Sequence, residues 1–464
     1  MIILGTNSIK DTGYDVANSC RFDYGSADYL NKTLGTATNR KKFTSSFWIK
    51  RTELYVNNSR QQNIFTAGTN SGTNVDQIYF RYDTLDILGY ESSSVKFQFR
   101  TTQLFRDTSS WGNIVFAFDS TQSTASNRVK IYYNGSQITD FSTETYPTQN
   151  LEPLWNLNTP HYYGKNTSGA NYGAYYLSEC CFIDGQALDP TSFGEFDEDS
   201  GIWKPIDVSG LTFGNNGFYL DFEDSSALGN DAAGSNNFTV NNLTATDQST
   251  DTCTNNFATL NPLNVPTSAA PAFSEGNLKS ICNASGKFMG SLTIAVSSGK
   301  WFWEIKATEL SGGNSYIGVG DETAVAENAR QNNNGYGNSV MYRTNGQTRI
   351  STNSSTVDAS YGNSYTQGDI IGVALNADDN QVTFYKNGTP QNSGTPVSIP
   401  TPTGFLTGFI ALGLAQNETF EINTGSPPFA ISSGNADANG YGNFEYAVPS
   451  GYFSLNTKNL SEFG

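Results

Sequence analysis

The chain has few of the residues on which catalysis and metal binding usually depend. Its 464 residues include one histidine and five cysteines. Any Ser-His-Asp or Cys-His arrangement would have to pass through His161, which has no acidic partner near it in the sequence. The cysteines show no paired spacing and no Cys-x-x-Cys motif, so we expect buried thiols rather than disulfides or a zinc site. The sequence therefore predicts a protein that is not an enzyme.

Positive charge is also scarce. The chain has 26 Lys and Arg against 43 Asp and Glu, which gives a net charge of −17. Such a surface repels phosphate groups, so we predict no nucleic-acid partner. No stretch approaches the roughly 20 apolar residues of a membrane-spanning helix, so we predict no membrane insertion. The start, Met1–Gly5, has a short apolar run without a basic segment, and we expect an N-terminal arm rather than a signal peptide, with synthesis in a cytoplasm.

Helical periodicity is almost missing, and β-type alternation takes its place. Hydrophobic residues make up only 37% of the chain, but 13% of the residues are aromatic, which argues against disorder. Aromatic and β-branched residues suit sheet cores, while Asn and Gly suit tight turns. We therefore predict an all-β protein with two concanavalin-like β-sandwich (jelly-roll) domains in tandem and a loop-rich connector. Less than about a tenth of the residues should be helical.

Three segments near the N-terminus carry a first resemblance. Apolar and polar residues alternate in 43–51 and 111–119, and 128–138 reads as a hairpin with an Asn-Gly turn. These segments resemble the strands of laminin-G-like jelly rolls. The resemblance implies one such domain at 20–200, preceded by an N-terminal arm at 1–19.

The next region, 201–274, is rich in loops. Phe218, Leu220 and Phe222 alternate and indicate at least one buried strand. We expect this region to be an ordered connector that packs on the first sandwich, and its proline-containing end, 265–271, is the best candidate for a linker.

A hairpin in 368–388 indicates the second domain. Ile371, Val373 and Leu375 alternate with small residues, and Asn387–Gly388 suits a tight turn with positive φ angles. The sequence of this hairpin, in which GDIIG is followed by FYKNG, resembles the core of SPRY domains. SPRY domains are β-sandwiches that bind partners through loops. The resemblance implies a SPRY-like sandwich at 275–426, with a C-terminal tail at 427–464.

Longer motifs resemble a group of virion and tail proteins from tailed bacteriophages, particularly marine ones. The matching motifs lie at 182–190, 193–198, 201–205, 217–231, 254–262 and 455–460. The resemblance implies a virion location on the tail or particle surface, with other virion proteins as partners. Two functions stay open: a tail-fibre-like adhesin that binds a host-surface glycan or receptor, and an architectural capsid or tail decoration protein that binds only neighbouring subunits. By analogy with fibre proteins, and because the apolar Met1–Leu4 needs a partner, we expect a homotrimer.

Two acidic turns resemble catalytic or calcium-binding sequences. Glu195, Asp197 and Asp199 alternate as the paired carboxylates of some glucanases do, but glycine and serine bracket the run and the last residue is the shorter aspartate. We therefore predict a solvated acidic turn without glycosidase activity. This turn and Asp378–Asn380 leave calcium binding open, with Asx-type turns as the alternative; no other cofactor is predicted.

Tyrosines in Asn- and Gly-rich segments are the candidate contacts for a ligand or partner. Sugar faces stack on such rings while amide side chains bind hydroxyl groups. The alternative is that these tyrosines pack in the cores or at subunit contacts. The candidates are Tyr162, Tyr163 and Tyr172 in the first domain and Tyr336, Tyr342 and Tyr361 in the second.

Overall fold

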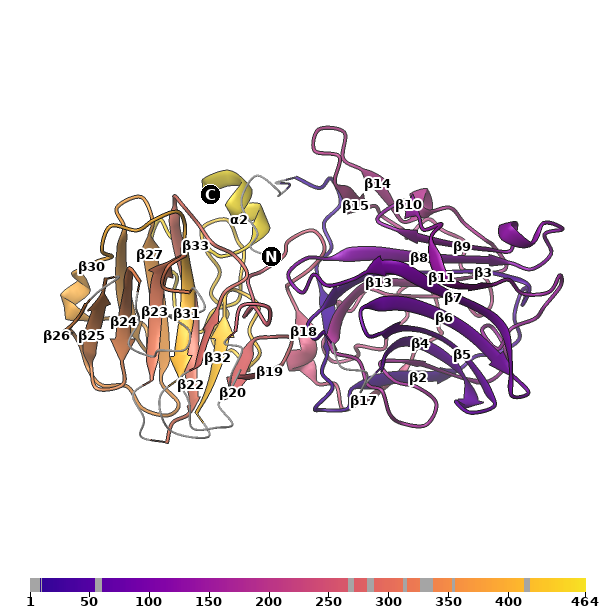
Figure 1. Cartoon of the computed structure of the whole chain (residues 1–464), viewed down its shortest axis with the longest axis horizontal. Helices are drawn as coiled ribbons and strands as arrows, with labels where there is room; N and C mark the ends of the chain where they lie inside the picture. Colours follow the sequence, from indigo (N-terminus) through magenta and orange to yellow (C-terminus); the bar gives the residue numbers. More distant parts are fainter. Residues whose placement is uncertain are drawn as a thin grey trace. The chain divides into compact units, whose positions relative to one another are not determined.

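The computed structural model divides the chain into two compact units (Figure 1). The first unit is Asp11–Thr254, and the second unit contains Asn255–Gly464. Strands account for 44% of the structure and helix for 5%, which confirms the all-β prediction. The structure describes residues 9, 11–54, 61–265, 271–281, 288–311, 315–325, 337–352, 355–412 and 418–464.

The first unit is a sandwich of two eight-stranded sheets and a small hairpin. One sheet has the order β10 (Ser136–Gln137), β9 (Val129–Tyr133), β8 (Gly112–Asp119), β3 (Lys42–Arg51), β13 (Tyr175–Asp184), β1 (Ser19–Phe22) and β18 (Gln248–Ser249), with β16 (Phe218–Leu220) paired to β13. The other has the order β11 (Phe141–Thr145), β7 (Ser94–Leu104), β6 (Thr84–Glu91), β5 (Asn74–Arg81), β4 (Gln61–Asn70), β12 (Pro160–Tyr163), β2 (Tyr29–Thr33) and β17 (Thr239–Asn241). The hairpin is β14 (Gly194–Phe196) with β15 (Trp203–Pro205), and short 3-10 turns lie at η2 (Ala125–Asn127), η3 (Pro190–Ser192) and η4 (Ala245–Asp247).

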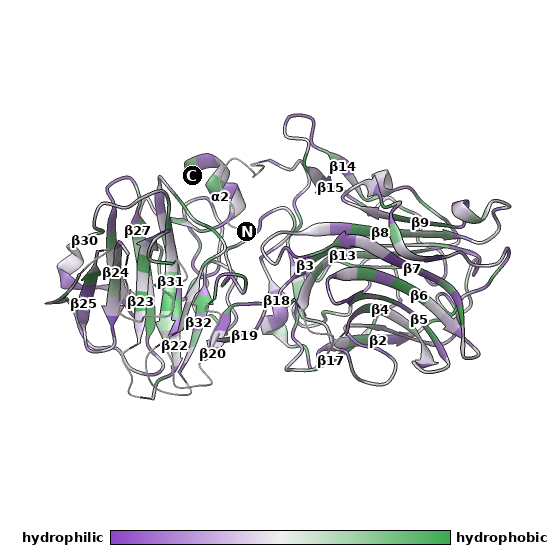
Figure 2. Cartoon of the chain, in the orientation of Figure 1, coloured by the Kyte–Doolittle hydropathy of each residue, from purple (hydrophilic) through white to green (hydrophobic). Residues whose placement is uncertain are grey.

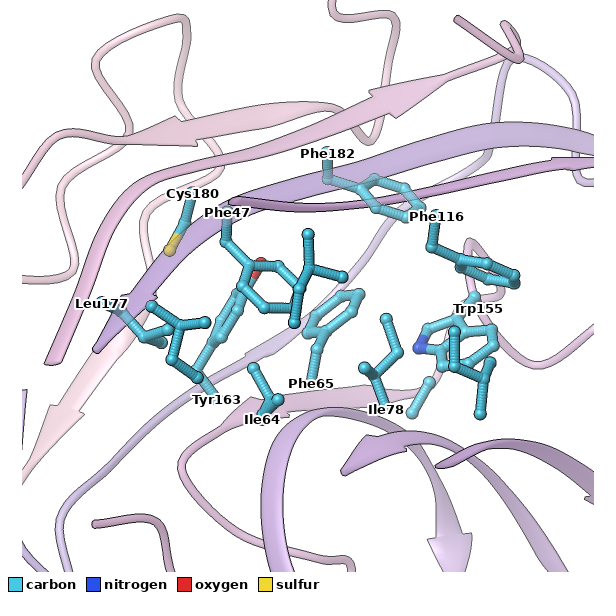
Figure 3. Packing of buried hydrophobic residues seen from close by; sticks show 14 of the residues in the cluster. Phe47, Ile64, Phe65, Ile78, Phe116, Trp155, Tyr163, Leu177, Cys180 and Phe182 are labelled. Atoms are coloured by element: carbon cyan, nitrogen blue, oxygen red, sulfur yellow. The ribbon is translucent and has the colours of Figure 1, made fainter. Parts of the chain in front are cut away.

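The core of this sandwich follows from the alternation of side chains along each strand. On β8, Ile114, Phe116 and Phe118 point into the space between the sheets, whereas Val115 points outward and packs in a separate cluster. Figure 3 shows Phe116 and Phe182 from one sheet facing Phe65 and Ile78 from the other. The alternating segments of the sequence therefore build a single aromatic-rich core.

Besides β15 of the small hairpin, the predicted connector supplies three strands to the large sheets of the first unit. β16 pairs with β13, β17 with β2, and β18 with β1. Phe218, Leu220 and Phe222 lie in the sandwich core. The unit boundary at Thr254/Asn255 precedes the predicted one at 274/275, because the chain after Asn255 pairs within the second unit.

The second unit is a sandwich of a nine-stranded and a six-stranded sheet. The larger sheet has the order β19 (Ala272–Ser274), β20 (Lys279–Ile281), β32 (Thr419–Asn423), β22 (Lys300–Glu309), β27 (Ile370–Asn376), β28 (Gln381–Lys386) and β29 (Thr389–Pro390), with β30 (Val397–Ser398) on β28 and β33 (Phe453–Ser454) on β22. The smaller has the order β21 (Phe288–Ser291), β31 (Leu406–Leu412), β23 (Tyr316–Asp321), β24 (Ser339–Arg343), β25 (Gln347–Ser351) and β26 (Thr356–Ser360). The unit also holds the 3-10 turn η5 (Asn392–Gly394) and the helix α2 (Thr457–Phe463).

The hairpin that indicated the second domain forms as predicted. β27 and β28 pair in antiparallel register, with Val373 opposite Phe384, and both side chains lie in the core. Asn387 and Gly388 have φ angles of 48° and 75°, the left-handed values that a two-residue hairpin turn requires. Figure 2 shows hydrophobic residues concentrated on strands such as β31.

The predicted tail is built into the second unit. β33 pairs in parallel with β22, and the backbone N–H of Ala258 donates to the carbonyl of Leu455 at 3.0 Å. The side chain of Asn456 caps α2 by accepting from the N–H of Asn459. Within the described residues, no helix has the length and apolar composition that a membrane span requires.

Candidate ligand-binding site

Adjacent tyrosines on β12 lie on opposite sides of its sheet. Tyr163 points into the core, where its ring stacks on Phe65 with centroids 4.6 Å apart (Figure 3), and it is fully buried. Tyr162 points to the outer face and is partly exposed. The prediction that Tyr163 contacts a ligand is therefore wrong, because successive side chains of a strand alternate between the two faces.

Four partly exposed tyrosines gather on the outer side of this sheet, and we call them the tyrosine platform. Tyr29 on β2 is the central ring, with centroids 6.5 Å from Tyr162 and 6.4 Å from Tyr172. Tyr24 makes an edge contact with Tyr172 at 6.3 Å. The structure thus brings together two predicted residues, Tyr162 and Tyr172, and adds two that sequence reasoning missed.

Tyr172 is presented by an ordered loop between β12 and β13. The Asn166 side chain accepts from the N–H groups of Ser168 and Ala170, at 3.1 and 2.9 Å. At the base of the loop, the N–H of Gly173 donates to the carbonyl of Gly164 at 2.8 Å. Gly164 has a φ of +93°, and a Cβ there would lie 2.6 Å from a backbone oxygen, so only glycine fits this position. The loop is therefore fixed by its own backbone.

Tyr24 is held by a second tight turn, between β1 and β2. The carboxylate of Asp23 accepts from the N–H of Gly25 at 2.7 Å, and the carboxylate of Asp28 accepts from the N–H of Asp23 at 2.9 Å. Such Asx-type bonds stabilise turns. Tyr29 directly precedes the core residue Leu30 on β2. Because successive side chains of a strand point to opposite faces, this position could have indicated an outward ring.

Lys165 lies on the tyrosine platform. Its ammonium nitrogen is 3.7 Å from the ring centroid of Tyr29 and 4.7 Å from that of Tyr162, which is cation–π geometry. Burial lowers the pKa of Lys165 below its ordinary value. Sequence reasoning did not identify this residue, because its position over the rings depends on how the loop folds back.

Amide side chains border the platform on the same face. The side chain of Asn241 on β17 donates to that of Asn31 on β2 at 2.7 Å, and Asn31 is paired in register with Tyr162. Next to the platform on this face, Thr66 on β4 and Gln77 on β5 are buried, so they offer little accessible surface to a ligand. The platform offers ring faces, amides and one ammonium group.

The candidate tyrosines of the second unit lie elsewhere. Tyr342 is fully buried and stacks on Phe384 at 5.4 Å, and Tyr361, 8% exposed, meets the same ring edge-on. The prediction that these two rings form a contact surface is wrong, because Tyr342 lies on β24 and both rings fill the sandwich core. Tyr336 lies outside the described residues.

His161 has a structural role. Its Nδ1–H donates to the carbonyl of Thr159 at 2.8 Å, and its Nε2 accepts from the N–H of Asn156 at 3.3 Å. The ring is fully buried, and burial lowers the pKa of His161 to about 4. Both ring nitrogens are therefore engaged by the backbone.

The acidic segment after β14 forms a hydrogen-bonded turn. Asp197 accepts from the N–H and hydroxyl of Ser200 at 2.9 and 2.7 Å. Lys204 lies 3.4 Å from Glu195 and 3.5 Å from Asp197. The solvated acidic turn predicted for this run is present, although its first residues belong to a short strand.

The second acidic turn also has internal partners. Asp378 accepts from the N–H of Gly299 at 2.8 Å, and Asp379 accepts from the side chain of Asn376 at 2.8 Å. In the part of the chain that the structure describes, no three His, Cys, Asp or Glu side chains gather as metal ligands. The cysteines described there, Cys20, Cys180, Cys181 and Cys253, are free thiols.

Comparison with known proteins bears on the second unit. Residues 300–427 match the SPRY domain family. This match covers the strands from β22 to β32 and includes the β27–β28 hairpin. No curated protein matches the chain.

Several solved structures are similar to parts of the chain. The SPRY domain of human HERC1 is 18% identical and covers 35% of this chain and 96% of its own, with a TM-score of 0.26. Domains LG4-5 of the mouse laminin alpha1 chain are 10% identical over 97% of this chain and 89% of their own, with a TM-score of 0.30. A putative carbohydrate binding protein from Bacteroides ovatus is 16% identical over 49% of this chain and 59% of its own, with a TM-score of 0.33. Because these TM-scores are low, the fold of each unit is assigned from its own strand order and not from these similarities.

Proposed function

We propose that the chain is a non-enzymatic adhesin whose first unit binds glycans on the tyrosine platform. The observation that carries the proposal is the gathering of four partly exposed tyrosine rings on one outer sheet face. Aromatic rings that serve only packing are normally buried with their neighbours, as Tyr163 is. Rings left at the surface as a group offer contact area to a partner.

The chemistry of the platform suits a sugar. Apolar C–H faces of a pyranose ring pack on aromatic rings, and its hydroxyl groups need donors and acceptors beside them. Asn31 and Asn241 supply both kinds of group at the border of the platform. The tight turns that hold Tyr24 and Tyr172 lower the cost of ordering the site on binding.

The sequence resemblance to tailed-phage virion proteins supports a place for this adhesin on the tail or particle surface, with a host glycan as its ligand and other virion proteins as neighbours. A homotrimer belongs to the same proposal; Met1–Leu4, on which that expectation rested, lie outside the described residues. The architectural alternative uses the same rings against a neighbouring subunit.

The proposal is tested with Tyr29→Ala and Tyr162→Ala in the full-length protein. Each should weaken glycan binding about tenfold or more, since anchor residues of a binding site typically contribute at least 1.4 kcal/mol. Tyr90→Ala is the matched control, because Tyr90 is a partly exposed tyrosine on β6 of the same sheet that lies outside the platform. Binding is measured on a glycan array and then by calorimetry with the best ligand.

Two results would overturn the proposal. One is a wild-type protein that retains no glycan on the array. The other is platform variants that bind as the Tyr90→Ala control does. Phage particles carrying Tyr162→Ala separate the adhesin from the architectural role: loss of adsorption with normal incorporation supports the adhesin, and loss of incorporation supports the alternative.

A further inference from the structure

The ring faces of the tyrosine platform are already in contact with a cation. The Lys165 ammonium lies 3.7 Å from the centroid of Tyr29 and 4.7 Å from that of Tyr162. A ligand that stacks on either ring must share the ring with this ammonium or displace it. The chemistry of the ligand therefore depends on what Lys165 does when the ligand arrives.

Lys165 contacts aromatic rings where some other lysines contact a carboxylate. Lys50 lies 2.6 Å from a carboxylate oxygen of Asp251, and Lys386 lies 3.1 Å from one of Asp369. For Lys165, the described part of the chain shows contacts to tyrosine rings and no ion pair. The ammonium of Lys165 is therefore held by ring faces, and an anionic group of a ligand could pair with it.

The loop keeps this ammonium at the platform. Lys165 is flanked by Gly164, whose conformation only glycine adopts easily, and by Asn166, whose side chain bonds the loop backbone. The backbone at Lys165 is thus fixed, while its long side chain can move from the ring to a nearby anion. Lysine carries a compact charge on a flexible stem, which suits such a movement.

A neutral and an acidic sugar meet this site with different consequences. A neutral sugar that stacks on Tyr29 displaces the ammonium and loses the cation–π interaction without replacing it. An acidic sugar brings a carboxylate or sulfate that pairs with the displaced ammonium while the ring faces become free for stacking. An acidic sugar should therefore bind more tightly than a neutral sugar of similar shape.

We propose that the tyrosine platform selects acidic glycans, with Lys165 as the residue that binds the carboxylate or sulfate group of a uronic acid or sulfated sugar. The inference rests on the proposed glycan binding and adds its ligand class. The negative charge of the whole protein repels anionic glycans elsewhere on its surface, so the preference depends on this one local cation.

The test is a glycan array on which each uronic-acid or sulfated glycan is printed beside its neutral counterpart. We expect the wild-type protein to bind the acidic member of a pair at least tenfold more tightly, as measured by calorimetry on the strongest pair. Lys165→Gln should reduce this preference about tenfold, which is the usual effect of losing one hydrogen bond to a charged group. Lys165→Arg, which keeps the positive charge, should retain most of the preference. Added NaCl should weaken acidic binding more than neutral binding.

Lys130→Gln is the matched control, because it removes one positive charge from β9 of the other sheet. It should leave the preference unchanged. Equal or stronger binding of neutral glycans by the wild type, or an unchanged preference in Lys165→Gln, overturns the acidic-glycan inference alone if Tyr29→Ala still weakens glycan binding about tenfold or more. Absence of any glycan binding, or binding that is insensitive to Tyr29→Ala, overturns the platform itself.

Discussion

Tyrosines cluster in both units, but the two clusters have opposite settings. In the first unit Tyr29 and Tyr162 lie on the outer face of a sheet and are partly exposed. In the second unit Tyr342 and Tyr365 lie inside the sandwich, 0% and 2% exposed, with centroids 5.5 Å apart. The hydroxyl of Tyr365 donates to the carbonyl of Ser315 at 3.1 Å, which satisfies it without solvent.

The difference shows that ring clustering alone does not mark a binding surface. Inter-ring distances are similar in the two clusters, and both sequences are rich in Asn, Gly and Tyr. What differs is the side of the sheet to which each ring points, together with the partner of its hydroxyl group. A ring that fills the core contributes to stability, and a ring on the outer face is available for a ligand.

The largest expected change in stability comes from truncating a buried ring of the second unit. Tyr342→Ala should reduce the free energy of unfolding by about 3–5 kcal/mol, as expected for the loss of a large buried ring. Tyr172→Ala, which removes a partly exposed ring of the platform, should cost less than about 1 kcal/mol. Denaturant unfolding with hydrogen exchange on β27 and β28 measures the first effect; equal costs for the two variants would contradict the assignment.

A second test compares two lysines that lie over tyrosine rings. Lys50 lies 5.6 Å from the ring centroid of Tyr176, and its ion pair with Asp251 is buried. Trp111 also donates to Asp251, at 2.9 Å. Lys50→Met should destabilise the first unit by about 3 kcal/mol, because it leaves a buried carboxylate without its counter-charge.

The matched variant for Lys50→Met is the double change Lys50→Met with Asp251→Asn. It removes the charge of both partners, so much of the stability should return. Thermal unfolding of the full-length protein measures both variants. A double variant as unstable as the single one would show that the contribution of Lys50 is packing rather than charge.

Two tyrosine hydroxyls of the first unit bind a buried glutamate, and this contact predicts a pH dependence of stability. Glu179, at a bulge of β13, accepts from the hydroxyls of Tyr219 at 2.7 Å and Tyr14 at 3.3 Å. Burial raises the pKa of Glu179 to about 7 from 4.5. Because the folded state holds this proton more tightly, its stabilising contribution is full below about pH 4.5 and is lost as the pH rises through 7.

Glu179→Gln should therefore gain stability relative to the wild type as the pH rises from 5 to 8, by about 2 kcal/mol. The difference between variant and wild type isolates this residue, since burial also raises the pKa of Glu304 in the second unit to about 7. Denaturant midpoints at several pH values provide the measurement. A constant difference across this range would mean that Glu179 is already ionised at pH 5.

The smallest effect concerns the stability contribution of Lys165. Lys165→Gln should cost only about 0.5–1 kcal/mol, the usual value of an exposed cation–π contact. This contrasts with Lys50, whose role is structural. If Lys165→Gln destabilised the protein as strongly as Lys50→Met, the ammonium would be a structural clamp on the loop rather than a group held ready for a ligand.

The secondary structure was predictable where alternation was strong. The β27–β28 hairpin and β8 follow directly from period-two patterns and turn residues. The polar segment 351–365 shows little apolar alternation, yet it contains β26, an edge strand whose residues are all exposed. An edge strand without an inward-facing row has no apolar alternation to identify it.

Composition and local patterns are enough to predict the fold class, the two sandwiches and the acidic turns, because alternation, turn residues and charge runs are local properties of the chain. Only the tertiary structure decided which tyrosines face outward together. Tyr24, Tyr29 and Tyr172 come from a turn, a strand and a distant loop, and Lys165 reaches their rings through the fold of that loop. Such a site depends on strand pairing between β2 and β12, segments more than a hundred residues apart, and no local pattern encodes that pairing.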